Sequence, residues 1–333
     1  MSDDDASPAS PEPLDPPGRT GSPLAPGSVS LRLYPHDLPP AEVVAELRTQ
    51  ARLAEAAGFD GVMTSEHHGG FANYLPNPLL AATWALEATE RVWAAPCPLL
   101  LPLRPITQVV EDLAWTAQRF PDRVGAGFAP GALPLDFEMA GVPFDEARAR
   151  FRAALPEVTA ALAGRASGPL ADDPAVAALA ASPIPAVGAA QGPVAARWAA
   201  AAGAGLLFDS IIAVQRAAEV AAAYREAGGT GPCVLIRRAW VGEPPDREVA
   251  AQMDRFRRMA PDRAQAHWAA AGGLVADPDP AAVAERLRAQ RDAAGCDALN
   301  LRVFHAGITP ATARGQIEAL GAEVLPRLRS AGA

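Results

Sequence analysis

The sequence predicts an α/β protein of the (β/α)8 barrel class, and three observations support this. Eight short apolar segments of strand length alternate with amphipathic helical segments from residue 29 onward. Strands that alternate with helices indicate a parallel sheet covered by helices, and eight such units favour a closed barrel over an open sheet. The chain has 333 residues, more than the roughly 250 that one barrel typically needs.

The strands are expected where short apolar runs end in Gly, Pro or polar residues. The first is an alternating run, Ser30 to Tyr34, and a helix that stops at Gly58 leads into the second. The remaining strands follow the same logic, and the full set is 29–34, 61–65, 92–101, 123–128, 184–188, 205–208, 233–241 and 298–303. The helices between them are expected at 41–57, 76–90, 105–119, 145–163, 193–202, 213–227, 280–294 and 310–329.

The domain organisation follows from composition. Residues 1–27 are rich in Pro, Ser, Asp and Gly and are expected to be a disordered N-terminal tail. Residues 28–333 are expected to form a single barrel domain with an insertion near 246–280, which includes a helical excursion at 246–271. A variable Ala/Pro/Gly-rich stretch lies at 164–182, and a loop runs through Gly141 and Pro143.

Charge and composition exclude several function classes. The net charge is −9 without a basic stripe, which argues against nucleic-acid binding. The chain contains no lysine, so a lysine Schiff base is excluded. The three cysteines are far apart, no apolar run has the length of a membrane span, and the N-terminus lacks the features of a signal peptide. We therefore expect a cytoplasmic protein that does not bind membranes.

Histidines cluster at the predicted carboxyl ends of strands. His36 follows the first strand, Glu66, His67 and His68 follow the second, and His305 follows the last. These strands are neighbours in a closed barrel, and barrel active sites form at that face. We therefore expect Glu66, His67 and His68 to be catalytic. A metal-dependent barrel hydrolase that uses these four histidines and Glu66 is an alternative, but no HxH pair follows the first strand, so no metal site is predicted.

The run Glu66-His67-His68 is followed downstream by Asn77-Pro78. This combination resembles the luciferase-like flavin monooxygenases, and it is the most specific of several motifs that do. The resemblance covers about residues 29–240 and also includes Leu101-Pro102, Glu111-Asp112, Gly127, Gly131, Phe137, Gly141, Arg148, Trp198 and Gly203. It implies a TIM barrel that binds reduced FMN at its carboxyl-terminal face and uses O2 to oxidise a small organic substrate, with His67 as the catalytically important histidine.

The resemblance also implies a cofactor-binding set. Arg148 matches a phosphate-contacting arginine, and the second phosphate site falls on Gln191 and Gly192, where Pro193 opens a helix whose free N–H groups favour an anion. The implied flavin-binding residues are Ala95, Cys97, Pro98, Gly127, Arg148, Gln191, Gly192 and Ser210. The resemblance further implies a cis peptide bond between Cys97 and Pro98.

This chain departs from the family pattern at two positions. Pro130 stands where relatives have another phosphate-binding arginine, and Ala129 stands where luciferase has a reactive cysteine. An F420-dependent oxidoreductase on the same fold, and a flavin-binding barrel without catalytic activity, are therefore alternatives.

The partners are expected to be few. No second module for NAD(P)H is apparent, so a separate flavin reductase is expected to supply FMNH2, with O2 and a small organic molecule as the other reactants. The segment Leu79 to Trp84 is either a homodimer surface, as in relatives, or a core-facing helix.

Overall fold

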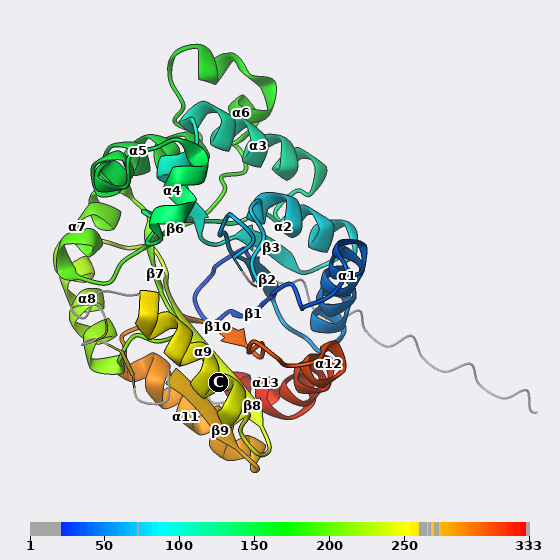
Figure 1. Ribbon diagram of the computed structural model, residues 1–333. Coiled ribbons are helices and arrows are strands. Elements are labelled where there is room, and N and C mark those ends of the chain that lie inside the picture. Colours follow the sequence, from blue (N-terminus) through cyan, green and yellow to red (C-terminus); the bar gives the residue numbers. More distant parts are fainter. Residues whose placement is uncertain (1–20, 72, 260–264, 266–267, 270–272, 331–333) are drawn as a thin grey trace, which may run out of the picture.

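The computed structural model describes residues 21–71, 73–259, 265, 268–269 and 273–330, and it shows a parallel barrel ringed by helices (Figure 1). The hydrogen-bonded strand order is β3-β2-β1-β10-β8-β7-β6-β5-β4, with every pairing parallel. The strands are β1 (Val29–Arg32), β2 (Gly61–Thr64), β3 (Trp93–Pro96), β4 (Leu99–Leu100), β5 (Ala126–Ala129), β6 (Ala186–Ala189), β7 (Gly205–Phe208), β8 (Cys233–Val241), β9 (Leu274–Asp277) and β10 (Ala298–Arg302).

The barrel closes between β3 and the segment that leads into β5. The backbone N–H of Ala94 donates to Arg123 O at 2.9 Å, and Gly125 N–H donates to Ala94 O at 3.0 Å. The predicted barrel class is thereby confirmed. The surrounding helices are α1 (Pro40–Ala56), α2 (Pro78–Glu87), α3 (Ile106–Arg119), α4 (Pro134–Ala140), α5 (Ala147–Leu162), α6 (Pro174–Ala178), α7 (Pro193–Ala202), α8 (Val214–Glu226), α9 (Asp246–Met259), α11 (Pro280–Ala293), α12 (Pro310–Ala319) and α13 (Leu325–Arg329).

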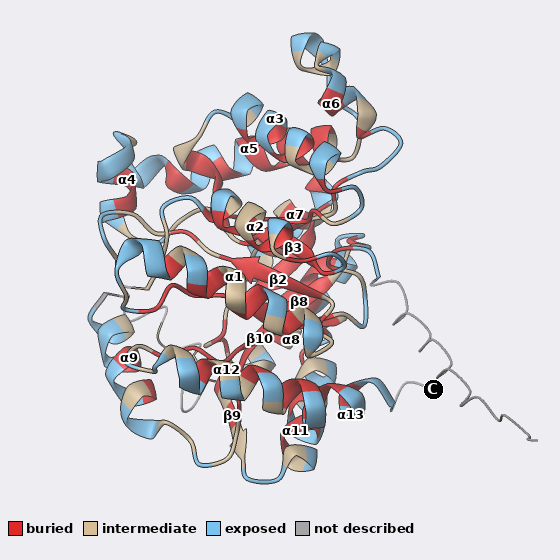
Figure 2. Cartoon of the chain, turned by 90° about the vertical axis from the view of Figure 1, so that its right-hand side faces the viewer, coloured by how far each residue is buried: buried red, intermediate tan, exposed pale blue. Residues whose placement is uncertain are grey.

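Apolar side chains fill two separate spaces. The larger cluster lies between the strands and the helices, and it takes alternate strand residues such as Leu31, Val62 and Leu301. The smaller cluster contains Met63, Trp93 and residues of the opposite strand face, so it fills the inside of the barrel. Most barrel strands are therefore buried on both faces, as the red strands at the centre of Figure 2 show.

Residues 21–27, which were expected to belong to a disordered tail, are part of the described structure. The predicted tail ran to residue 27, but Leu24 is buried and packs with Trp93 and Met63 inside the barrel. Gly27 N–H donates to Asp297 O at 2.7 Å, which ties this segment to the loop before β10. The error arose because one apolar residue among Pro, Ser and Gly gives no periodic signal. Residues 1–20 lie outside the described residues.

Three elements differ from those expected. The predicted strand 92–101 is divided into β3 and β4 by Cys97-Pro98, whose peptide bond is cis, as predicted. Helix α4 occupies part of the expected loop before Gly141. The insertion contains α9 and also a strand, β9, which pairs with the outer half of β8. Much of the expected excursion beyond residue 259 lies outside the described residues.

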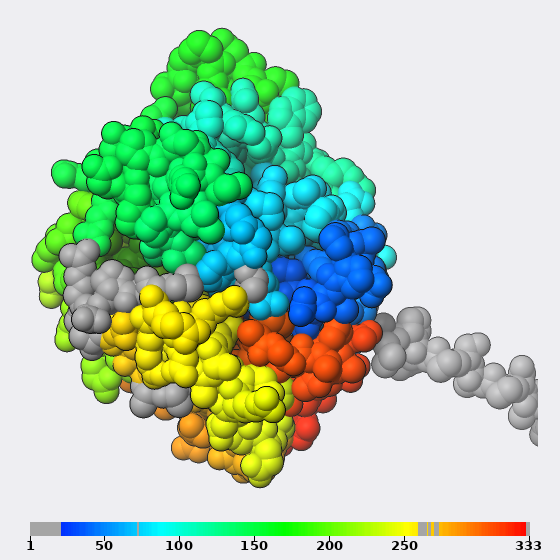
Figure 3. Space-filling view, in the orientation of Figure 1, coloured from blue at the N-terminus to red at the C-terminus, as the bar shows by residue number. Residues whose placement is uncertain are grey.

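Helices α4 and α9, which do not belong to the eight repeated strand–helix units, lie at the same end of the barrel. Figure 2 shows both at the left, whereas α13 and the C-terminal end of the described chain lie at the right. In the space-filling view, yellow α9 lies on the same face as the light-blue segment after β2 and the orange-red segment after β10 (Figure 3). This is the carboxyl-terminal face, where the functional side chains were expected.

Candidate active site

Glu66 ties the end of β2 to its neighbours. Its buried carboxylate accepts from Leu100 N–H at 2.8 Å and from Arg104 Nη1 at 2.6 Å. His68 Nε2 lies 2.6 Å from the same Oε1 oxygen that Arg104 contacts. A carboxylate with these charge-assisted bonds is well satisfied in a buried position. Glu66 therefore positions His68 and the end of β4 and is not available as a free base.

His67 is held by a carboxylate that sequence analysis did not identify. Its Nδ1 lies 2.8 Å from Asp136 Oδ2, while Asp136 Oδ1 accepts from His68 N–H at 2.8 Å. Asp136 is fully buried on α4. A carboxylate that accepts this hydrogen bond needs a donor opposite it, so the network assigns a proton to Nδ1 of His67. No local signal marked Asp136, which looks like an ordinary acidic residue in a first helical turn.

Aromatic rings form the wall around His67. The His67 ring lies 4.7 Å from the Phe71 ring and 4.5 Å from the Tyr74 ring, measured between centroids. Tyr74 packs edge-on against Tyr34, at 5.3 Å, so the wall continues to the end of β1. The His67 side chain retains 21% of its exposure, so a substrate can reach it.

The predicted residues of the third and fourth strands of the barrel lie together inside it. A side chain at Gly127 would meet Cys97 Sγ at 2.2 Å, so Gly127 is required by the close approach of Cys97. Ala95 and Cys97 are fully buried, and Pro98 is half-buried. Burial raises the pKa of the Cys97 thiol to about 12 although Arg32 nearby lowers it, so this thiol stays protonated.

An anion site could form at the start of α7. Gly192 caps this helix and Pro193 is its first residue, so the first-turn N–H groups point outward. Arg216, which sequence analysis missed, donates from Nε to Gln191 O at 3.2 Å and from Nη1 to Glu219 at 2.8 Å. Its Nη2 lies 3.1 Å from the Cβ position of Gly192, which places a positive charge at the helix start.

The other predicted phosphate residues are spread around this point. Gln191 donates to Asp209 Oδ2 at 2.8 Å, and Ser210 follows directly in the chain. Arg148 is exposed at the start of α5, and within the described part of the chain it makes no hydrogen bond or ion pair. The structure therefore brings Gln191 and Ser210 together through Asp209, beside Gly192, and among the described residues it records no hydrogen bond or ion pair between Arg148 and this group.

The remaining histidines do not converge with His67. His36 Nδ1 lies 3.1 Å from Ile308 O and its Nε2 lies 2.8 Å from Gln50 Nε2, so both ring nitrogens are satisfied. His305 is fully buried against Trp240. His267 lies outside the described residues. Among those that are described, no group of three His, Cys, Asp or Glu side chains is placed to hold a metal ion.

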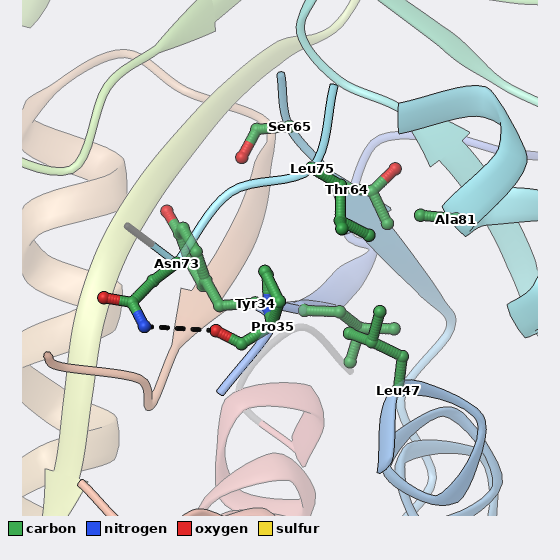
Figure 4. A pocket seen from close by; sticks show the side chains of 9 residues that line it. Tyr34, Pro35, Leu47, Thr64, Ser65, Asn73, Leu75 and Ala81 are labelled. Carbon is green, nitrogen blue, oxygen red and sulfur yellow. Dashed lines mark hydrogen bonds between the residues drawn. The ribbon is translucent and has the colours of Figure 1, made fainter. Parts of the chain in front are cut away.

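A small cavity lies behind the aromatic wall. It has a volume of about 10 Å³ and is bordered by Tyr34, Ser65, Asn73 and Leu75 among others (Figure 4). Asn73 Nδ2 donates to Pro35 O at 3.3 Å and closes one side. This volume suits one water molecule, so the cavity is not a substrate site.

Comparison with known proteins places the chain in a family. The family model described as luciferase-like monooxygenase matches residues 27–326. The chain belongs to the luciferase-like monooxygenase family. A similar curated protein is the alkanal monooxygenase alpha chain of Photorhabdus laumondii, 29% identical over 123 residues. That match spans only 37% of this chain and 34% of the relative, about a third of its length.

Solved structures of this family's fold superpose on nearly the whole chain. The FMN-bound oxygenating constituent of 3,6-diketocamphane monooxygenase from Pseudomonas putida has a TM-score of 0.69 and 18% identity, over 90% of this chain and 99% of its own. The coenzyme F420-dependent tetrahydromethanopterin reductase from Methanopyrus kandleri has a TM-score of 0.69 and 17% identity, over 92% and 100%. At these identities the similarity shows the shared fold alone. Of these two proteins with the same fold, the first is bound to FMN and the second depends on F420.

No helix in the described part of the chain is both long enough and apolar enough to cross a bilayer.

Proposed function

We propose that this luciferase-like protein is a flavin-dependent monooxygenase that uses reduced FMN and O2 to oxidise a small organic substrate. The observation that carries the proposal is the His67–Asp136 pair at the carboxyl-terminal mouth of a family barrel, with a partly exposed imidazole beside an aromatic wall. A histidine whose tautomer is set by a buried carboxylate is well suited to general acid–base work.

The chain's residues would act on the substrate in distinct ways. Asp136 would hold the Nδ1 proton of His67, so that Nε2 can accept a proton from the substrate and later return it. Phe71 and Tyr74 would exclude water from one side of the imidazole. Glu66 would position the chain after Pro98 through Leu100, and with it the surface on which the flavin ring would rest. Bound flavin would supply the electron transfer and oxygen activation that these side chains lack.

The residues at α7 fit the phosphate of FMN. The free first-turn N–H groups, the absence of a Gly192 side chain and the Arg216 guanidinium favour an anion at this helix start. Arg216 would supply the positive charge that Pro130 cannot. Arg148 remains a second candidate, because its exposed side chain is not held by any described partner.

Cofactor binding tests this proposal directly. The apoprotein would be titrated separately with reduced FMN, oxidised FMN and F420, and we expect reduced FMN to bind most tightly. Tighter binding of F420 would favour the F420-dependent oxidoreductase. Reduced FMN that binds without stimulating oxygen-dependent substrate turnover would indicate a non-catalytic flavin-binding barrel. If none of the three ligands binds, the proposal is wrong.

The partners follow from the same proposal. A separate reductase would supply reduced FMN in the cytoplasm, and no nucleic acid or membrane would be involved. A homodimer through α2 remains a prediction, to be tested by sedimentation: Leu80 is 45% exposed on this helix, whereas Ala81, Ala82 and Ala85 face the core.

A further inference from the structure

Three arginines form one layer inside the barrel. Arg302 on β10 pairs in register with Arg238 on β8, and Leu31 of β1 pairs with Leu301, so Arg32 lies at the same level. Leu31 and Leu301 face the surrounding helices, so the alternating arginines face the interior. Three adjacent strands thus carry positive charge at one level below the carboxyl-terminal mouth. We refer to Arg32, Arg238 and Arg302 as the arginine layer.

Two members of the arginine layer are buried without a counter-charge. Arg32 and Arg302 are 3% and 2% exposed. Arg32 donates to the amide oxygen of Asn300 at 2.8 Å and contacts the Met63 sulfur at 3.8 Å, while Arg302 donates to Phe304 O at 2.9 Å. Within the described residues neither forms an ion pair. Burying such charges is costly unless a negative group compensates them.

Several polar atoms beside the arginine layer also lack partners. Arg302 Nη2 and both ring nitrogens of His305 are buried without a hydrogen bond in the described structure. Burial, and then Arg302 and Arg238, lower the pKa of His305 to about 2, so its ring is neutral and offers one donor and one acceptor. Buried polar atoms are rarely left unsatisfied, so an unexplained group of them indicates a missing partner.

The walls around these atoms are aromatic. The Arg302 guanidinium lies 4.3 Å from the centroid of the Tyr34 ring, and Phe304 stacks on that ring at 5.3 Å. Trp240 lies 6.1 Å from His305. Planar guanidinium groups bind planar carboxylates in a bidentate manner, and aromatic walls suit an apolar body attached to such a group. Both features favour an organic oxyanion over a small inorganic ion.

We propose that the arginine layer binds the oxyanion of an acidic organic substrate, a carboxylate or phenolate, through Arg32 and Arg302. This names a substrate class for the proposed oxidoreductase and rests on that function, but the binding itself needs no flavin. The organic body would extend from the arginine layer toward His67 at the mouth.

Binding can be measured on the wild-type apoprotein with benzoate, and with benzamide as the neutral control of the same shape. A ligand of the folded state raises the midpoint of thermal unfolding as its concentration rises. Benzoate is expected to do so, and benzamide at equal concentration and ionic strength is not. Equal responses to both, or none to benzoate at tens of millimolar, would overturn the proposal even if flavin binds normally.

The variants Arg302→Met and Arg302→Gln test the residue, with Arg237→Met as the matched control. Arg237 is also fully buried and adjacent to the layer in sequence, but it faces the other side of β8 and donates to Gln290, Ile236 and Ile212. Arg302→Met is expected to weaken benzoate at least about ten-fold. Its apoprotein should unfold at a similar or higher temperature, because an uncompensated charge is removed. Arg237→Met should unfold earlier but keep its benzoate affinity.

A reduced flavin also carries an oxyanion, and a second measurement separates the two sources. The affinities for reduced and oxidised FMN are compared in wild type and Arg302→Gln. If the substrate is the ligand, the two FMN affinities fall by the same small factor or not at all. A loss of ten-fold or more that is confined to reduced FMN, with benzoate binding unchanged, would contradict the assignment to substrate and transfer it to the cofactor. If the wild-type protein binds benzoate but neither form of FMN, the proposed function is refuted and the anion site is not.

Discussion

His67 Nδ1 and Asp136 Oδ2 lie 2.8 Å apart, although the two residues are 69 positions apart in the chain. Asp136 reaches His67 because α4 follows β5 and crosses the carboxyl-terminal face, where it also receives the backbone N–H of His68. One buried carboxylate thus sets both the imidazole orientation and the backbone that carries it.

Replacement of His67 tests its role in the oxidation. His67→Ala is expected to lower the turnover of the substrate by roughly 10²- to 10⁴-fold, because a general acid–base group is lost. Turnover is measured under saturating reduced cofactor, and the affinity for the flavin serves as the control. His68→Ala should cost less, because His68 is paired with Glu66. Full turnover in His67→Ala would remove His67 from the mechanism.

The arginines near the phosphate site can be separated by ligand choice. Arg216→Ala is expected to weaken FMN by ten-fold or more and riboflavin hardly at all, because only FMN carries the phosphate. The family resemblance implies that Arg148 also contacts the phosphate. If it does, Arg148→Ala should weaken FMN and spare riboflavin in the same titration. Arg150→Ala is the control, since Arg150 pairs with Glu146 on the surface of α5. Equal losses for both ligands would assign either arginine a structural role.

Glu66 is expected to stabilise the fold as well as the site. Glu66→Gln removes the negative charge opposite Arg104 and should lower the free energy of unfolding by about 1–3 kcal/mol. The matched control is Glu87→Gln. Glu87 Oε1 lies 3.1 Å from Arg119 Nη2, but the Arg119 side chain is 67% exposed, so this variant should change the free energy of unfolding by less than about 1 kcal/mol. Denaturant unfolding of both variants measures the difference. Equal effects would show that the buried network contributes no more than a surface pair.

His305 should make the protein acid-sensitive. Its folded pKa of about 2 lies below the ordinary 6.5, so below pH 6.5 the unfolded state binds the proton first and the folded state loses stability. Between pH 7 and 4.5 this contributes a loss on the order of 2–3 kcal/mol. His305→Phe should show a correspondingly flatter decline, measured by denaturant unfolding without organic anions. An identical decline in wild type and variant would contradict the burial of a neutral ring.

The order of strands and helices could be predicted because each is encoded locally. Each strand is short, apolar and followed by a turn residue, and Gly58, Pro78 and Pro193 mark helix boundaries that the structure contains. Helix α4 was missed because its seven residues sit between proline and glycine in a stretch that looks like a loop. Strand β9 was missed because four residues after a long excursion carry no alternating pattern.

The site was only partly predictable, because its partners come from distant segments. Glu66 and His67 stood out as adjacent polar residues after a strand, but Asp136 and Arg216 are ordinary helix residues until the fold brings them close. Arg32 and Arg302 did carry a signal that was missed. Each interrupts an apolar strand on its alternate face, and in a closed barrel that face is also buried, so a charge there indicates a ligand or a buried network.

The packing of Leu24 inside the barrel has a practical consequence for anyone who shortens this protein. Leu24 fills the amino-terminal end of the barrel, and Pro23 and Leu24 occupy the space beside Gly125. A fragment cut at the first strand would keep every strand and helix but leave the Trp93 end of the barrel open to water. Shortened versions should therefore begin at or before residue 21, and a fused partner belongs upstream of that position.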